Sequence, residues 1–259
     1  MSTISALAGV VIKELYRRKD FYVLFVLTAV LTVLMASVNF FHSSGIVRIL
    51  KDVCLLLIWV SVLVIAITTT ARQIPAEREN RTMFPLLAKP VSRAQVVIGK
   101  FAGCWFACGL ALLVFYVFFA VLSGAREAQW PLWQFFKALW LHWMMSGIVV
   151  GVALLGSVVF TAPSSNITIC FVIILGILLL GRHLHRLALQ QPEPLQTVVT
   201  VIYYLIPHLE WYDLRDFLVN DRALPSLLDC GLASLYAAIY TAMLLFGAWL
   251  VFRRKALNT

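Results

Sequence analysis

The sequence predicts an all-α integral membrane protein with six transmembrane helices, and two observations lead to this fold class. The first is composition: 62% of the 259 residues are hydrophobic and 13% are charged, whereas soluble domains average about 45–50% apolar and about 25% charged residues. The second is a series of apolar runs near the length of about 20 residues that crosses a bilayer. The chain length fits a single transmembrane domain over residues 1–259.

The predicted spans contain no Asp, Glu, Lys or Arg, as expected for helices that face lipid. They cover Phe21–Phe41, Val53–Ala71, Phe101–Ser123, Leu139–Thr161, Ile167–Gly181 and Leu232–Phe252. A further apolar stretch, Thr197–Leu209, is short and contains Pro207. Stretches of that length are typical of re-entrant or interfacial segments rather than spans.

The distribution of basic residues predicts the orientation of the chain. With six spans, both termini and residues 72–100 share one side, and that side holds 13 of the 21 Lys and Arg residues. A seventh span would place the basic C-terminus opposite the basic N-terminus. Because cytoplasmic loops are enriched in Lys and Arg, we expect six spans with both termini in the cytoplasm.

Residues 1–20 are expected to form an amphipathic helix on the cytoplasmic membrane surface, because apolar residues recur there at helical spacing. These residues are Ile4, Leu7, Ala8, Val11 and Leu15. The alternative is an early start of the first span. A cleaved signal peptide is not indicated, since the apolar run that follows is too long.

Residues 182–231 form the predicted external segment, an outer re-entrant or loop region between the fifth and sixth spans. It carries several prolines and the carboxylates Glu210, Asp213, Asp216, Asp221 and Asp229. His183 and His185 form an HxH pattern, which in an extended segment can bind copper or zinc. No further ligand lies at a suitable spacing, so we expect no metal site.

Several functional classes are excluded by missing patterns. The P-loop pattern GxxxxGK[ST] and the TVGYG filter of potassium channels are both absent from the sequence. Among Asp, Glu, Lys, Arg and His, only His142 lies inside a predicted span, and it is interpreted as an interfacial histidine. The net charge of +9 fits basic membrane flanks better than a nucleic-acid surface. We therefore expect no catalytic residues in this chain and no nucleic-acid partner.

Small and aromatic residues predict how the helices pack. Gly103, Gly147, Gly151 and Gly156 lie at spacings that allow helices to approach closely. Tryptophans that precede and begin the fourth span, Trp130, Trp133, Trp140 and Trp143, are interpreted as anchors at the lipid headgroup level.

The most informative segment is Arg72–Gly103, between the second and third spans. Pro75 is expected to end the second helix, and Thr82 can cap a short helix that continues through Ala88. Ser92 and Gln95 form a capping box at the start of the next helix. A short helix between two spans can transmit force from a cytoplasmic partner, although an ordinary solvated loop is an equally good interpretation of this pattern alone.

This segment resembles the intracellular loop of type-2 ABC exporter permeases. The matching residues are Glu77, Glu79, Thr82, Leu86, Leu87, Pro90, Val91, Ser92, Arg93, Gly99 and Lys100. Within that family the sequence is most similar to permeases that serve the maturation of nitrous-oxide reductase and other multicopper enzymes. Arg81 departs from the pattern, because many members have glycine before the threonine.

The resemblance implies a multi-pass subunit of the bacterial cytoplasmic (inner) membrane that is paired with a separate ABC ATPase subunit. A second permease subunit, identical or related, and membrane lipid are implied as further partners, together with an accessory periplasmic or membrane protein. ATP and Mg²⁺ would bind to the partner ATPase, and no cofactor would bind to this chain. The residues implied to couple to the ATPase are Glu77, Arg78, Glu79, Arg81, Thr82, Phe84, Leu86, Leu87, Pro90 and Arg93.

Two other functions stay open at this point. The chain could be a membrane scaffold or assembly factor without transport activity. An ion-coupled carrier is the third hypothesis, and the lack of charged residues within the spans argues against it. Nothing in the spans indicates the substrate.

Overall fold

A computed structural model describes residues 3–17, 19–37, 45–79, 92–127, 130–188, 192–193, 195–220, 222 and 224–254. Every regular element in these ranges is helical, which confirms the predicted all-α fold class. The elements are α1 (Thr3–Arg17), α2 (Lys19–Ser37), α3 (Gly45–Ala71), α4 (Gln73–Glu79), α6 (Arg93–Glu127), α7 (Leu132–Val159), α8 (Pro163–Ala188), α9 (Leu195–Leu205), the 3₁₀ helix η1 (Leu209–Tyr212), α10 (Arg215–Val219) and α11 (Leu227–Arg254).

Four helical stretches within the described ranges are long and apolar enough to cross a membrane. They are Arg48–Glu79, Arg93–Gly124, Leu132–Val159 and Leu227–Arg254. The other two predicted spans fall on α2 and α8, whose apolar parts cover only Tyr22–Val33 and Pro163–Leu179. Both parts are shorter than the roughly 20 residues that cross a bilayer, and the predicted end of the first span at Phe41 lies outside the described residues.

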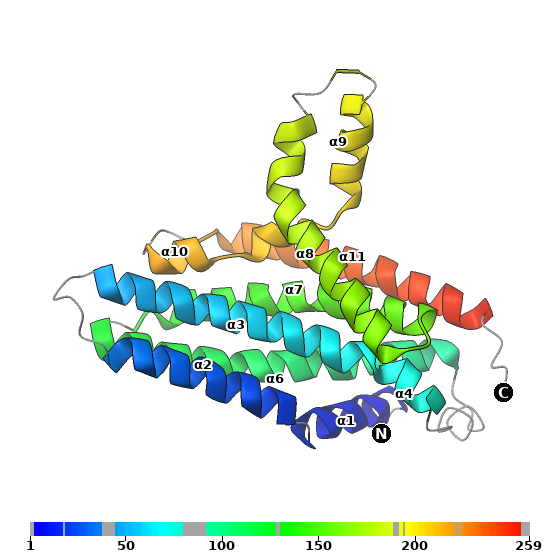
Figure 1. Ribbon diagram of the computed structural model, residues 1–259, viewed down its shortest axis with the longest axis horizontal. Coiled ribbons are helices and arrows are strands. Elements are labelled where there is room, and N and C mark those ends of the chain that lie inside the picture. Colours follow the sequence, from blue (N-terminus) through cyan, green and yellow to red (C-terminus); the bar gives the residue numbers. More distant parts are fainter. Residues whose placement is uncertain are drawn as a thin grey trace.

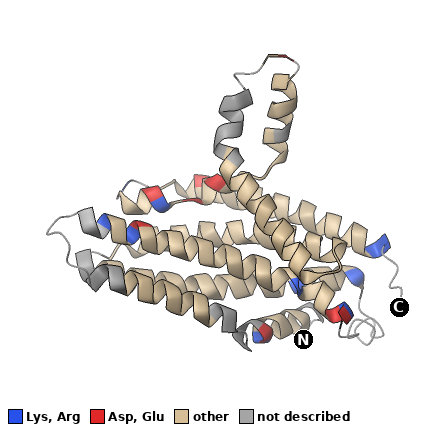
Figure 2. Cartoon of the chain, viewed as in Figure 1, with Lys and Arg blue, Asp and Glu red and all other residues tan. Residues whose placement is uncertain are grey.

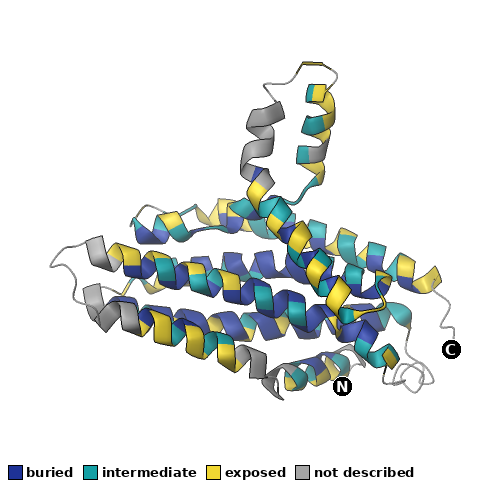
Figure 3. Ribbon diagram, viewed as in Figure 1, coloured by how far each residue is buried: buried dark blue, intermediate teal, exposed yellow. Residues whose placement is uncertain are grey.

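Helix α7 is the centre of the bundle and packs against α3, α6, α8 and α11. Figure 3 shows most of its middle and second half buried, whereas α2, α8 and α11 present exposed faces. Two glycines of α7 that were predicted to allow close packing lie against large side chains of α6 and α11. A Cβ at Gly147 would lie 3.2 Å from Nε1 of Trp105, and one at Gly151 would lie 3.1 Å from Cδ1 of Leu244. The small residues therefore allow close helix packing, as predicted.

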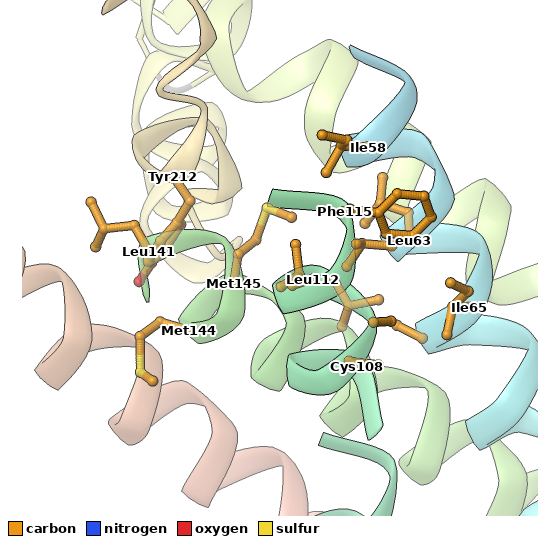
Figure 4. Close-up of a cluster of buried hydrophobic side chains, with 14 of the residues drawn as sticks. Ile58, Leu63, Ile65, Cys108, Leu112, Phe115, Leu141, Met144, Met145 and Tyr212 are labelled. Atoms are coloured by element: carbon orange, nitrogen blue, oxygen red, sulfur yellow. The ribbon is translucent and has the colours of Figure 1, made fainter. Parts of the chain in front are cut away.

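Large apolar side chains fill the space between the central helices (Figure 4). Ile58 from α3, Phe115 from α6 and Met145 from α7 are fully buried there, and Tyr212 of η1 covers one side. Inside a bilayer, helices gain no hydrophobic free energy from leaving lipid for one another, so tight van der Waals packing holds such a core together. The exposed apolar faces of α2, α8 and α11 suit contact with lipid.

Tryptophans join helices as well as facing outward. The indole N–H of Trp105 donates to the carbonyl of Trp143 at 3.0 Å, and the indole N–H of Trp143 donates to the carbonyl of Trp105 at 3.0 Å. The two rings stack with centroids 4.6 Å apart, which fixes α6 against α7. Trp130 and Trp133 are exposed, in keeping with the predicted anchors. Trp143 was predicted as an anchor, but it binds a neighbouring helix instead.

Helix α1 packs on the beginning of α6. Val11 is buried, and a Cβ at Gly103 of α6 would lie only 2.7 Å from the Val11 Cβ. Val10, one residue earlier, is exposed. The N-terminal segment is thus a separate amphipathic helix, and the protein itself covers part of its apolar face.

The external segment is more helical than predicted. Helix α8 runs through Ala188, so His183 and His185 lie in a helix and not in the extended conformation that an HxH metal site would use; their side chains are outside the description. The second half of α8 and α9 form a hairpin that projects from the bundle (Figure 1). After Pro207 the chain returns to the bundle, where the Tyr212 hydroxyl donates to the Ala233 carbonyl at 2.7 Å.

Candidate functional site

Helix α4 lies at one end of the bundle, near α1, the start of α6 and the end of α11 (Figure 1). Helix α3 ends at Ala71, and α4 resumes at Gln73. Pro75 was expected to end the second helix, but it lies inside the first turn of α4, where a missing N–H is tolerated. The helix break is therefore at Arg72, three residues earlier than predicted.

The first turn of α4 is embedded in the bundle. Ile74 is fully buried and packs in a cluster with Val96 of α6, Leu154 of α7 and Phe252 of α11. A helix of seven residues is too short to be stable alone, so this packing holds α4 in place. Through Ile74, α4 therefore contacts three long helices.

A polar network joins α4 to α1 and α6. The ammonium group of Lys100 lies 2.5 Å from Glu77 Oε1 and donates to Gln73 Oε1 at 3.0 Å. The Gln73 amide then donates to Glu14 Oε2 of α1 at 3.4 Å. Only 5% of the Lys100 side chain is exposed, against 21% for Glu77. Low solvent exposure strengthens these contacts and makes the loss of one partner costly.

The break between α3 and α4 is held by a buried amide from α8. Asn166 is fully buried, and its side-chain N–H groups donate to the carbonyls of Ala71 at 3.2 Å and Ala153 at 3.1 Å. The last residues of a helix leave carbonyls without partners inside the helix, so Asn166 satisfies the end of α3. This contact ties the break at Arg72 to α7 and α8.

Arg93 binds the end of α11 instead of extending into solvent. Its guanidinium donates to the carbonyls of Phe252 at 2.6 Å and Arg253 at 3.0 Å and lies over the Phe252 ring. A cation at a helix C-terminus is stabilised by free carbonyls and the helix dipole. Arg93 therefore joins the last helix to the first residue of α6, and its predicted contact with an ATPase stays a prediction.

The remaining predicted coupling residues divide into two groups. Glu77, Arg78 and Glu79 lie together on the last turn of α4, and Glu79 is exposed. A groove between α4 and the start of α8 is lined by Arg72, Glu79 and Ser164 among others. The other predicted residues lie outside the described part of the chain: Arg81, Thr82, Phe84, Leu86, Leu87 and Pro90.

The predicted capping box at the start of α6 is confirmed. The Ser92 hydroxyl accepts the N–H of Gln95 at 3.2 Å, and the Gln95 side-chain oxygen accepts the N–H of Ser92 at 2.9 Å. Segment 72–100 therefore ends in the capped first turns of α6, which include Lys100.

The sequence did not indicate two residues of the polar network, Glu14 and Gln73, or the buried amide of Asn166 that binds the end of α3. Lys100 was recognised in the loop pattern, but no role was assigned to it. A lysine seven residues inside a long apolar helix was a usable signal, because a buried lysine needs a partner.

Charged side chains gather at the ends of the bundle and leave the middle of the long helices uncharged (Figure 2). Among the described residues, no group of three His, Cys, Asp or Glu side chains could hold a metal ion.

Comparison with protein families gives a match over most of the chain. Residues 31–255 match the family described as ABC-2 family transporter protein. No curated protein matched the sequence. The match includes the coupling segment, all four candidate spans and the external segment. The chain therefore belongs to the ABC-2 family, and it is an integral membrane protein that forms the transmembrane subunit of an ABC transporter and partners with a separate ATPase subunit.

Proposed function

We propose that this chain is the permease of an ABC exporter and that segment 72–100 transmits the closure of the ATPase to the membrane helices. The observation that carries the proposal is the attachment of α4. Its first turn is buried among α6, α7 and α11, and Lys100 pairs with Glu77. A partner bound beyond Glu79 would therefore act on a helix that is already joined to the spans.

The proposed topology has six spans, with α2 and α8 crossing the membrane beside the four long candidates. Both chain ends and α4 face the cytoplasm, and the α8–α9 hairpin faces the outside. The basic residues at the proposed cytoplasmic end support this orientation under the positive-inside rule. Helix α1 would lie on the cytoplasmic surface with its exposed face against lipid.

The proposed assembly contains two permease subunits, identical or related, over two ATPases in the bacterial inner membrane, with ATP and Mg²⁺ held by the ATPases. The likeness of the loop to the permeases of multicopper-enzyme maturation supports export as the direction. An accessory periplasmic or membrane protein completes the proposed set of partners.

Co-purification separates this proposal from a scaffold. The chain is purified with the ATPase encoded beside it, and ATP hydrolysis is measured for the ATPase alone and for the reconstituted complex. We expect a stable complex whose hydrolysis depends on this chain and is coupled to movement of a substrate across the membrane. A chain that inserts stably, but neither retains the ATPase nor changes its turnover, would be a scaffold instead.

A further inference from the structure

A second site lies in the other half of the bundle, near the external segment. A cavity of about 330 Å³, partly open to the outside, is lined by residues of α3, α7, α8, η1 and α10. Its lining includes the apolar side chains of Leu55, Trp59 and Leu178 and the charged side chains of Glu210, Asp213 and Arg215. This volume is at the lower end of the range for small-molecule sites, about 300–1,000 Å³.

A buried imidazole with a free nitrogen lines this cavity. His142 of α7 is only 3% exposed. Its Nδ1 lies 2.8 Å from the Tyr116 hydroxyl, whereas its Nε2 has no hydrogen-bond partner among the residues that the structure describes. The indole N–H of Trp59 is also buried without a partner. Buried polar atoms without partners are rare, because each costs about 1–3 kcal/mol. Both residues line one cavity. Nε2 of His142 accepts a hydrogen bond from a ligand when Nδ1–H donates to the Tyr116 hydroxyl, whereas the Trp59 N–H is a donor that an ammonium group does not satisfy.

Among the described residues that line the cavity, two carry carboxylates, Glu210 and Asp213, and one carries a guanidinium, Arg215. Nε of Arg215 lies 3.3 Å from Asp52 Oδ1, so its positive charge already has a carboxylate partner on α3. No described residue forms an ion pair with Glu210. Burial lowers the pKa of the neighbouring His208 although the Glu210 charge opposes this, so that imidazole is neutral near pH 7 and does not offset Glu210.

The position of Glu210 is set by a glycine. A Cβ at Gly181 of α8 would lie 2.6 Å from Glu210 Oε2. Glycine at this place therefore lets the carboxylate rest directly against the backbone of α8, at the edge of the cavity. Any larger residue would push the carboxylate away.

We propose that this cavity binds an amphipathic organic cation, with an ammonium group at Glu210 and Asp213 and an apolar body against the leucines. The Trp59 ring adds cation–π attraction, which strengthens when the cation is desolvated. The same chemistry occurs in a free lipophilic amine and in the ammonium headgroup of phosphatidylethanolamine. The proposal concerns ligand binding only, so it does not depend on coupling between this chain and the ATPase.

The test uses the purified chain without its ATPase, in nanodiscs of phosphatidylglycerol only. The probes are decylamine and decanol that carry the same photoreactive diazirine, and labelled residues are mapped by mass spectrometry. We expect the amine to label the α3 and α8 walls at least tenfold more than the alcohol at equal concentration. The double variant Glu210→Gln with Asp213→Asn should lose this preference and keep the weak labelling by the alcohol, which shows that the cavity is still folded.

Matched controls keep the test decisive. Asp216→Asn with Glu193→Gln removes two charges from the same segment outside the cavity and should leave the amine preference unchanged. Gly181→Ala should lower amine labelling several-fold by displacing Glu210. Competition by added phosphatidylethanolamine would identify a lipid headgroup as the ligand, whereas its absence would identify a free amine, and both support the site. Equal labelling by amine and alcohol, or an unchanged preference in the double variant, would overturn the proposal.

Discussion

At the scale of single residues, Lys100 joins α4 to α6 by an ion pair and a hydrogen bond. Its ammonium contacts both Glu77 and Gln73, and its side chain is 5% exposed. Removing one partner of a buried ion pair costs about 3–5 kcal/mol, whereas replacing both with apolar groups is often neutral. Because Glu77 keeps some solvent contact, the low end of that range applies.

We predict that Lys100→Met lowers the apparent melting temperature of the purified chain by several degrees, because Glu77 loses its cation. The double variant Lys100→Met with Glu77→Leu should recover at least half of that loss. Thermal unfolding of the wild type, both single variants and the double variant completes the cycle. A double variant with the summed losses of both single variants would show that the two residues do not interact.

At the same scale, Glu79 is the exposed charge that we expect to meet the ATPase. Charges at the rim of an interface act mainly on the association rate. Glu79→Lys should therefore slow ATPase binding several-fold at low salt, with a smaller effect at high salt. Glu193→Lys makes the same charge change on an exposed residue of the external segment. This variant should bind the ATPase at the wild-type rate. Equal slowing in both variants would assign the effect to net charge instead.

At the scale of elements, the contact between α1 and α6 depends on the missing side chain of Gly103. A Cβ there would lie 2.7 Å from the Val11 Cβ and 3.0 Å from the Ala8 backbone. Backbone atoms cannot rotate away, so α1 itself would have to move. Overpacking of this kind costs about 1–3 kcal/mol.

We predict that Gly103→Ala loosens α1 and speeds tryptic cleavage at Lys13 or Arg17 several-fold. Gly176→Ala in α8 is the matched control, because a Cβ there meets nothing within 4 Å. The same Gly→Ala change should then leave cleavage unchanged. Cleavage at the wild-type rate in Gly103→Ala would mean that α1 is not held by this contact.

At the scale of the whole molecule, the proposed topology is testable with introduced cysteines. The native cysteines are all buried, so background labelling should be low. Arg72 and Glu193 are both exposed and lie at opposite sides in the proposed orientation. Arg72→Cys should resist an impermeant thiol reagent in intact cells, and Glu193→Cys should react. The reverse pattern would invert the orientation.

Local patterns predicted the parts of this structure that depend on neighbours in sequence. The capping box at Ser92 and the four long spans follow from spacing and composition alone. The break at Arg72 did not, because the burial of Ile74 keeps α4 helical around Pro75. The partners of Lys100 come from α4, and Gln73 extends the network to Glu14 of α1, so the network needed the folded chain.

In the proposed assembly, the ATPase acts on the membrane helices through segment 72–100. Leu86 and Leu87 are the apolar residues of that segment that we expect to enter the ATPase interface, where each large buried side chain contributes about 1.5–3 kcal/mol. A charge at either position would be buried without a partner. Leu86→Met keeps an apolar side chain of similar volume and is the matched control.

The most direct measurement is ATPase recovery and substrate-stimulated hydrolysis for complexes that carry Leu86→Asp, Leu87→Asp or Leu86→Met. We predict at least tenfold weaker complex recovery or loss of stimulated hydrolysis in both aspartate variants, with normal membrane insertion. Leu86→Met should behave as the wild type. Full recovery and normal coupled turnover in both aspartate variants would contradict the account, since the segment would then be an ordinary solvated loop.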